Sequence, residues 1–183
     1  KTLELTDLAE EVFQDSRVEQ ATEQDISNLL WSFAKLNIDT TLFNSLESVI
    51  LDRLIKFKKP LNIINILWAY AKTGNGSERF YETVRRSLHL KMKTIPPQNM
   101  SAVLWSLDKS NSLTQSFARD ASLFVKSNIK KLKQDNLFIC RLALSSVLPM
   151  TEEDQVLHVD NIKEVVAVFT SVCTSDKLPL ADG

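Results

Sequence analysis

Three lysines occupy the same place in three similar stretches of the chain, and their spacing is the pattern best suited to binding chemistry. Lys35, Lys72 and Lys109 each follow a tryptophan by four residues, and successive copies are 37 residues apart. On a helix, polar positions in steps of three or four lie on one face and form a stripe. This polar stripe comprises Asp25, Asn28, Ser32 and Lys35; Asn62, Asn65, Ala69 and Lys72; and Asn99, Ala102, Ser106 and Lys109. Lysine neutralises phosphate and asparagine can hydrogen-bond base edges, so the polar stripe predicts a nucleic-acid contact.

A second group of cations lies near the ends of the segments that follow the polar stripe. This basic rim comprises Lys56, Lys58 and Lys59; Arg85, Arg86, Lys91 and Lys93; and Lys126, Lys130, Lys131 and Lys133. A helix dipole favours cations at its C-terminus, so solvated helix ends are one interpretation. Stacked repeats would gather about ten such cations, however, which indicates an anionic partner. The candidate binding residues are Asn28, Lys35, Lys56, Lys58, Lys59, Asn65, Lys72, Arg85, Arg86, Lys109, Lys130 and Lys131.

Two features of the copies have a structural explanation beside the functional one. Trp31, Trp68 and Trp105 are preceded by leucines, which favours packing between repeats over exposed stacking on bases. Asn62 and Asn99 fall in the first turn of the expected helices, where capping would account for asparagine without any ligand. The sequence leaves both alternatives open.

The elements that must position these residues are helical repeats. The period of 37 extends to leucines before the tryptophans and to phenylalanines twelve residues after them. It defines repeats at residues 25–61, 62–98 and 99–135 and a partial copy at 136–148, in which Leu142 takes the tryptophan position. Such units bury their apolar faces only by stacking, so we expect an all-α fold, an α-solenoid of helix-turn-helix repeats. Residues 1–24 should form an N-terminal capping helix, and 149–183 an acidic linker and a C-terminal capping helix with a frayed tail.

Local signals set the expected helix boundaries. Thr22 is an N-cap candidate, Pro60 suits the first position of a helix, and Gly74 suits a left-handed C-terminal cap. The second helix of the first repeat should span residues 42–57. Its inward side chains should be Phe43, Leu46, Ile50, Leu51, Leu54 and Ile55.

Several classes of protein are not expected. No run approaches the roughly 20 apolar residues that span a bilayer. Two cysteines and two histidines, far apart in the sequence, offer no metal site, and we assign no cofactor. There is no glycine-rich phosphate loop and no assignable nucleophile beside a histidine, so we assign no catalytic residue and expect no enzyme and no small-molecule substrate.

Charge is unevenly distributed although the formal net charge is −1. Residues 25–135 hold 17 Lys and Arg against 9 Asp and Glu, whereas the flanks hold 5 against 14. The repeats are therefore basic and the ends acidic, which favours an anionic partner for the repeats.

The segments LLWSFAKL, ILWAYAKTG and VLWSLDKS resemble the helical repeats of organellar RNA-binding proteins: the octotricopeptide repeats, the FAST-kinase-like repeats, and the heptatricopeptide repeats found with RAP domains. The period of 37 is most similar to the heptatricopeptide class. The resemblance covers residues 25–135, with a weaker extension over 136–148, and includes no RAP-like segment. It implies an RNA-binding protein of the mitochondrial matrix or of a plastid. The implied roles include that of a structural subunit of mitochondrial ribosomes whose rRNA is fragmented.

Two functions follow as hypotheses. In the first, the repeats clamp RNA, including rRNA, by its phosphates, beside neighbouring proteins of a ribonucleoprotein and away from any membrane. In the second, the chain is a protein–protein scaffold or assembly subunit of an organellar complex without direct RNA contact. The acidic residues Glu10, Glu11, Glu152, Glu153 and Asp154 favour the second in part, because they would repel RNA and could bind basic proteins.

Overall fold

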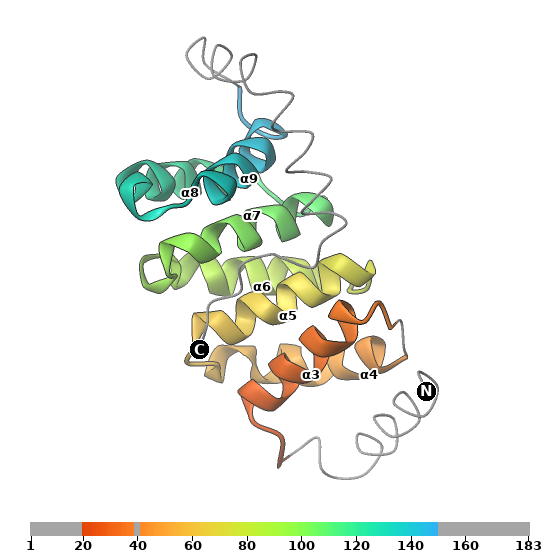
Figure 1. Ribbon diagram of the computed structural model, residues 1–183. Coiled ribbons are helices and arrows are strands. Elements are labelled where there is room, and N and C mark those ends of the chain that lie inside the picture. Colours follow the sequence, from red (N-terminus) through yellow and green to blue (C-terminus); the bar gives the residue numbers. More distant parts are fainter. Residues whose placement is uncertain (1–19, 39–40, 150–183) are drawn as a thin grey trace. The chain divides into compact units, whose positions relative to one another are not determined.

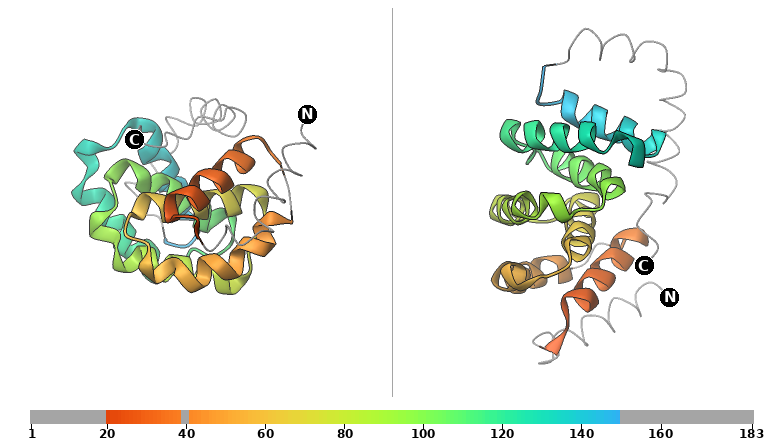
Figure 2. Two further views of the ribbon diagram at one scale, coloured as in Figure 1. Left: turned by 90° about the horizontal axis from the view of Figure 1, so that it is seen from below. Right: turned by 90° about the vertical axis from the view of Figure 1, so that its left-hand side faces the viewer.

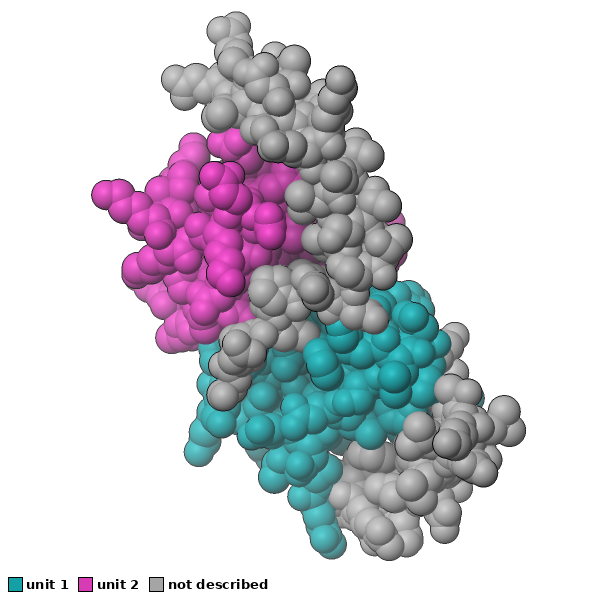
Figure 3. Space-filling model, in the orientation of Figure 1, with its two compact units in different colours: residues 1–92 teal, residues 93–183 magenta. Residues whose placement is uncertain are grey.

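The structure is a computed structural model that describes residues 20–38 and 41–149 (Figure 1). These residues form helices joined by turns, with no strand among them, which confirms the all-α class. The chain divides into two compact units, residues 1–92 and 93–183, and each is described by itself (Figure 3). Residues 1–19 and 150–183, which hold most of the two expected caps, lie outside the described residues, whereas Glu23 and Gln24 of the expected N-terminal cap belong to the first described helix.

The described part of the first unit contains two helix pairs. These are α3 (Glu23–Lys35) and α4 (Leu42–Arg53), then α5 (Pro60–Thr73) and α6 (Glu78–Leu90), with a short 3-10 helix at Leu54–Lys56. A second 3-10 helix, Met92–Thr94, spans the boundary between the units. Helix α3 packs along α5 and α4 contacts α6, so the first helices form one layer and the second helices another (Figure 2). The polar stripes of two copies therefore lie on neighbouring helices.

The second unit contains three α-helices in its described part. They are α7 (Met100–Lys109), α8 (Gln115–Ser127) and α9 (Gln134–Ser145), with 3-10 helices at Pro97–Asn99 and Ile129–Lys131. Helix α7 packs along α9, and α8 contacts both. Among the residues that the structure describes, no helix combines the length and apolar character that crossing a membrane requires.

The predicted boundaries at Thr22, Pro60 and Gly74 are confirmed. The Thr22 hydroxyl accepts a hydrogen bond of 3.2 Å from the Asp25 backbone N–H, and the Asp25 carboxylate accepts one of 2.9 Å from the Thr22 N–H. These bonds form a capping box, and hydrogen bonds from the Thr22 hydroxyl and backbone lower the pKa of Asp25. Pro60 is the first residue of α5, and Gly74 ends it with a φ of 74°.

The second helix of the first copy is shorter than the sequence predicts. Helix α4 ends at Arg53, and the chain tightens into a 3-10 helix at Leu54–Lys56. In a 3-10 helix residues three apart eclipse one another, so buried Leu54 is followed by buried Phe57 and the intervening side chains turn outward. The prediction that Ile55 faces inward is therefore wrong, because its side chain is 87% exposed. Leu51 is half-buried, whereas the other four predicted residues are buried.

An aromatic cluster fills the core of the first unit. The Tyr70 ring stacks on Phe80 with centroids 4.1 Å apart and meets Phe43 edge-on at 5.1 Å. Phe80 meets Tyr81 edge-on at 5.2 Å. Because these rings come from α4, α5 and α6, the cluster joins three of the unit's helices and holds α5 in the register that positions its polar stripe.

Candidate nucleic-acid interface

In the first unit, the lysines of two stripe copies lie over the tryptophans of their own helices. The Lys35 ammonium is 5.6 Å from the centroid of the Trp31 ring, and the Lys72 ammonium is 5.2 Å from that of Trp68. The two indole rings are 6.5 Å apart and tilted by 37°. The spacing of four residues along a helix produces each pair, and the packing of α3 on α5 brings the two pairs together.

The tryptophans of this unit serve mainly as packing residues. Trp68 is only 2% exposed, and Trp31 is half-buried against it. A ring in this position cannot stack on an incoming base, but its face still attracts a cation through the negative potential of its π-system. The structural alternative for the tryptophans is therefore favoured, and the lysines are the groups that reach the surface.

The polar stripe is open on α3 and partly closed on α5. Asn28 and Ser32 are exposed, and the Ser32 hydroxyl donates to the Asn28 carbonyl at 2.7 Å. On α5, Asn65 is half-buried, whereas Asn62 and Ala69 are buried. A partner that contacts this unit therefore has access to both lysines but to fewer of the small residues between them.

In the second unit, most of the polar stripe is buried. Lys109 is exposed, and its ammonium is 5.9 Å from the centroid of the half-buried Trp105 ring. Ala102 and Ser106 are buried, and the Ser106 hydroxyl donates to the Ala102 carbonyl at 2.7 Å within the same helix. These two residues of the predicted polar stripe are therefore inaccessible to a ligand, and the stripe of α7 reaches the surface at Lys109.

Capping does not explain the aligned asparagines. Asn99 precedes α7 but makes no side-chain cap hydrogen bond, and it is only 1% exposed. Both amide heteroatoms of Asn99 and of Asn136, and the amide nitrogen of Asn62, make no hydrogen bond within the described part of the chain. Nothing in the described contacts accounts for these buried amides, which are too deep to meet a nucleic acid directly.

The lysines of the basic rim that belong to the candidate set are exposed, but its two arginines are not at a helix end as predicted. Lys56, Lys58 and Lys59 are exposed after α4, as are Lys130 and Lys131 after α8. Arg85 and Arg86 lie within α6, which continues to Leu90, and not at its end. Arg86 is exposed and forms an ion pair of 2.7 Å with Glu82 one turn earlier, so ordinary helix chemistry explains this charge in part.

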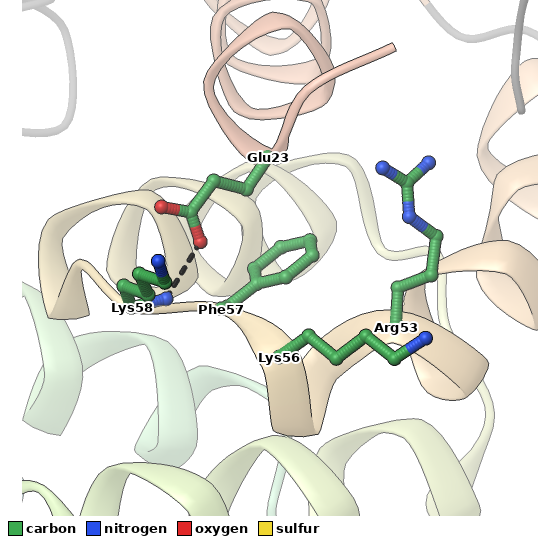
Figure 4. Close-up of a pocket in the computed structure, with 5 residues that line it drawn as sticks. All are labelled: Glu23, Arg53, Lys56, Phe57 and Lys58. Atoms are coloured by element: carbon green, nitrogen blue, oxygen red, sulfur yellow. Dashed lines mark hydrogen bonds between the residues drawn. The ribbon is translucent and has the colours of Figure 1, made fainter. Parts of the chain in front are cut away.

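One pocket, near the N-terminus of α3, involves residues that the sequence pattern did not single out. It has a volume of about 320 Å³ and is lined by Glu23, Arg53, Lys56, Phe57 and Lys58 (Figure 4). Lys56 and Lys58 belong to the basic rim, but Glu23 and Arg53 were not predicted. They come from segments 30 residues apart, and neither recurs at the period of 37, so no repeat signal could have found them.

The described residues offer no metal centre and no activated thiol. They contain no group of three His, Cys, Asp or Glu side chains that could hold a metal ion. Cys140 is buried in α9, and burial raises the pKa of its thiol to about 12. A thiol in that state is a poor nucleophile, so Cys140 acts as a small core residue.

Comparison with protein-family models, curated proteins and solved structures gives no match to this chain.

Proposed function

We propose that this chain is an RNA-binding helical-repeat protein, an α-solenoid that clamps RNA by its phosphates. The observation that supports it most is the pairing of Lys35 with Trp31 and of Lys72 with Trp68 on adjacent helices. An indole face beneath an ammonium group restricts where the charge can lie. Two cations presented in equivalent positions by neighbouring repeats suit the successive phosphates of one strand.

The surrounding residues support the same ligand. Asn28 and Asn65 lie about two turns before the lysines on the same helices and can supply polar contacts to bases or sugars. In the second unit, Lys109, Lys130 and Lys131 are exposed and can add phosphate contacts. The repeats hold 17 basic residues against 9 acidic ones, so the attraction extends beyond the named side chains.

The cellular setting of the proposal rests on the resemblance of the repeat motifs. It is the mitochondrial matrix, or a plastid, and the role is that of a structural subunit that holds rRNA. Ultraviolet crosslinking in isolated organelles, followed by sequencing of the attached RNA, tests this. Crosslinks to rRNA in a ribosome-sized particle are expected. Crosslinks to scattered transcripts outside such a particle would replace the ribosomal role by one in transcript binding.

A matched pair of charge removals tests RNA binding directly. Lys72→Gln removes a lysine of the polar stripe, whereas Arg79→Gln removes an exposed cation at the start of α6, outside the candidate set. Filter binding of single-stranded RNA over a range of salt concentrations should show weaker binding for Lys72→Gln on every sequence. The slope of log affinity against log salt should fall by about 0.7 for one lost phosphate contact.

The control should keep the affinity and the slope of the parent chain. Equal losses in the two variants would mean that RNA senses only the overall charge, and the assignment of Lys72 would fail. Absence of RNA binding at low salt would overturn the proposed function itself.

A specific observation supports the protein scaffold as a second candidate. Ile55 and Leu90 are 87% and 90% exposed, and each is followed by a lysine. Exposed aliphatic side chains beside cations suit an acidic, partly apolar protein surface better than a phosphate backbone. Ile55→Ser with Leu90→Ser should release a protein partner from the native complex while leaving RNA affinity unchanged. Retention of every partner by that variant would argue against the scaffold.

A further inference from the structure

The pocket in Figure 4 is lined by the first turn of α3 and by the end of the first copy of the repeat. It is called the Phe57 pocket here, after the buried residue of its lining. Positions 37 residues after its lining are occupied by Pro60, Leu90, Lys93, Thr94 and Ile95. Only Lys56 therefore has a cationic counterpart, Lys93, and the pocket is a local addition to the repeat.

Two hydrogen bonds hold opposite sides of the Phe57 pocket. The Glu23 carboxylate accepts a hydrogen bond of 2.8 Å from the backbone N–H of Lys58, which joins the first turn of α3 to the segment after α4 (Figure 4). The Arg53 guanidinium donates to the backbone carbonyl of Ala21. Both contacts join residues more than 30 positions apart, so the pocket is built by tertiary structure and not by one flexible segment.

The charge of the lining is unbalanced. Three cations, Arg53, Lys56 and Lys58, surround one carboxylate, that of Glu23, which gives an excess of two positive charges. Phe57 is only 3% exposed and adds an apolar side chain to the lining (Figure 4). Lys56 and Lys58 are exposed, so the attraction for an anion comes from the gathering of three cations at one place.

The volume suits a small ligand. About 320 Å³ is at the lower end of the range of ligand pockets, roughly 300–1,000 Å³. It is also the volume of about ten water molecules at liquid density, which exceeds what one inorganic ion needs. A ligand with a compact doubly charged group and a neutral body would satisfy both the charge and the space.

We propose that the Phe57 pocket binds a phosphomonoester dianion, supplied either by a free nucleoside monophosphate or by the 5′-phosphate of an RNA. A phosphomonoester carries between about −1.5 and −2 charges at pH 7, which matches the excess of two positive charges, whereas each internal phosphodiester carries one. With a free nucleotide as ligand, the proposal does not depend on RNA binding by the polar stripe.

The test uses inorganic phosphate, adenosine 5′-monophosphate and two oligoribonucleotides that differ only in a 5′-phosphate. Backbone amide shifts of the whole chain, measured by NMR during titration with phosphate and with the nucleotide, should move at Glu23, Phe57 and Lys58. The 5′-phosphorylated oligonucleotide should bind about tenfold more tightly than the 5′-hydroxyl form, as expected for about one charge-assisted hydrogen bond. The difference should shrink below about pH 6, where the dianion takes up a proton and becomes a monoanion.

Two matched lysine substitutions test whether the preference for a 5′-phosphate depends on the Phe57 pocket. Lys56→Gln should abolish the preference for the 5′-phosphate, whereas Lys93→Gln, at the equivalent position of the second copy, should keep it. Both lysines are exposed, so neither change should alter the fold, and circular dichroism checks this. Equal losses in the two variants, or unmoved pocket amides at millimolar phosphate, would overturn the proposal.

The outcomes separate this proposal from RNA binding by the polar stripe. RNA affinity without any preference for a 5′-phosphate, together with pocket amides that neither phosphate nor the nucleotide moves, would overturn the proposal for the Phe57 pocket and leave the proposed function. If the nucleotide shifts the pocket amides in a chain that binds no RNA, the proposed function fails and the proposal for the Phe57 pocket stands. A nucleotide that binds without a matching RNA preference identifies the free nucleotide as the ligand.

Discussion

The hydroxyl of Tyr70 in α5 donates a hydrogen bond of 2.6 Å to the backbone carbonyl of Phe43 in α4. The bond is buried and links the two helix pairs of the first unit at the point where their aromatic rings meet. Tyr70→Phe keeps the ring and removes only the donor. The free energy of unfolding in urea should fall by about 1 kcal/mol, the net contribution of one such bond. An unchanged midpoint and slope would show that the bond adds nothing to stability.

The same burial makes the unit sensitive to alkali. Burial is the main cause that raises the pKa of Tyr70 and of Tyr81 well above the ordinary value of 10.0, and the negative charge of Glu47 adds to it. Because folding favours the neutral phenol, this stabilisation is complete below pH 10 and is lost as the pH rises above it. On titration with alkali, tyrosinate absorbance should therefore appear only well above pH 10, together with loss of the helical circular dichroism signal.

The chain is well suited to this measurement because these are its only two tyrosines. Tyr81→Phe isolates Tyr70, whose titration should still be delayed. Ionisation near pH 10 with the helical signal intact would contradict the prediction.

Two glycines in one turn provide a matched comparison of backbone strain and crowding. Gly76 has a φ of 98°, and a Cβ there would lie 3.1 Å from atoms of Tyr70, Phe80 and Tyr81. Gly74 has a φ of 74° with nothing within 4 Å of an added Cβ. Gly74→Ala should cost about 1 kcal/mol of unfolding free energy from the left-handed conformation alone. Gly76→Ala should cost more, by about 1 kcal/mol or above, because the aromatic rings must also shift. Equal thermal shifts of the two variants would refute the crowding argument.

Cys140 should be inert in the folded protein. With a thiol pKa of about 12, on the order of one molecule in 10⁴ carries the thiolate at pH 8, and the side chain is fully buried. In a Cys173→Ser variant, where Cys140 is the remaining thiol, labelling by a disulfide reagent should follow unfolding and accelerate with urea. Fast labelling under native conditions would show that α9 opens more readily than its packing against α7 implies.

Local signals predicted three helix boundaries because the physics that sets them is local. Thr22, Pro60 and Gly74 act through bonds and dihedral angles within one turn of the chain, so neighbouring residues determine them. The end of α4 was not predicted, since helical periodicity does not distinguish a final α-turn from the 3-10 turn at Leu54–Lys56. That difference moved Ile55 from the expected core to the surface.

In the candidate site, too, the features set within one helix were predicted, and those set by tertiary packing were not. The spacing of four residues placed Lys72 over Trp68, and one helix is enough to produce that geometry. The burial of Asn99 and Ser106 depends on what packs against α7, which no pattern within the helix encodes. The Phe57 pocket also escaped the sequence, because Glu23 and Arg53 meet only after α3 and α4 have folded together.

The lysine–tryptophan pairs give the chain an optical property. Trp31, Trp68 and Trp105 are its only tryptophans, and each has a stripe lysine above its ring. A positive charge over an indole shifts its emission, so a ligand that draws the lysines away should change the fluorescence of every tryptophan at once. The protein therefore carries an unlabelled reporter of occupancy at the polar stripe, one that a ligand held only in the Phe57 pocket should leave unchanged.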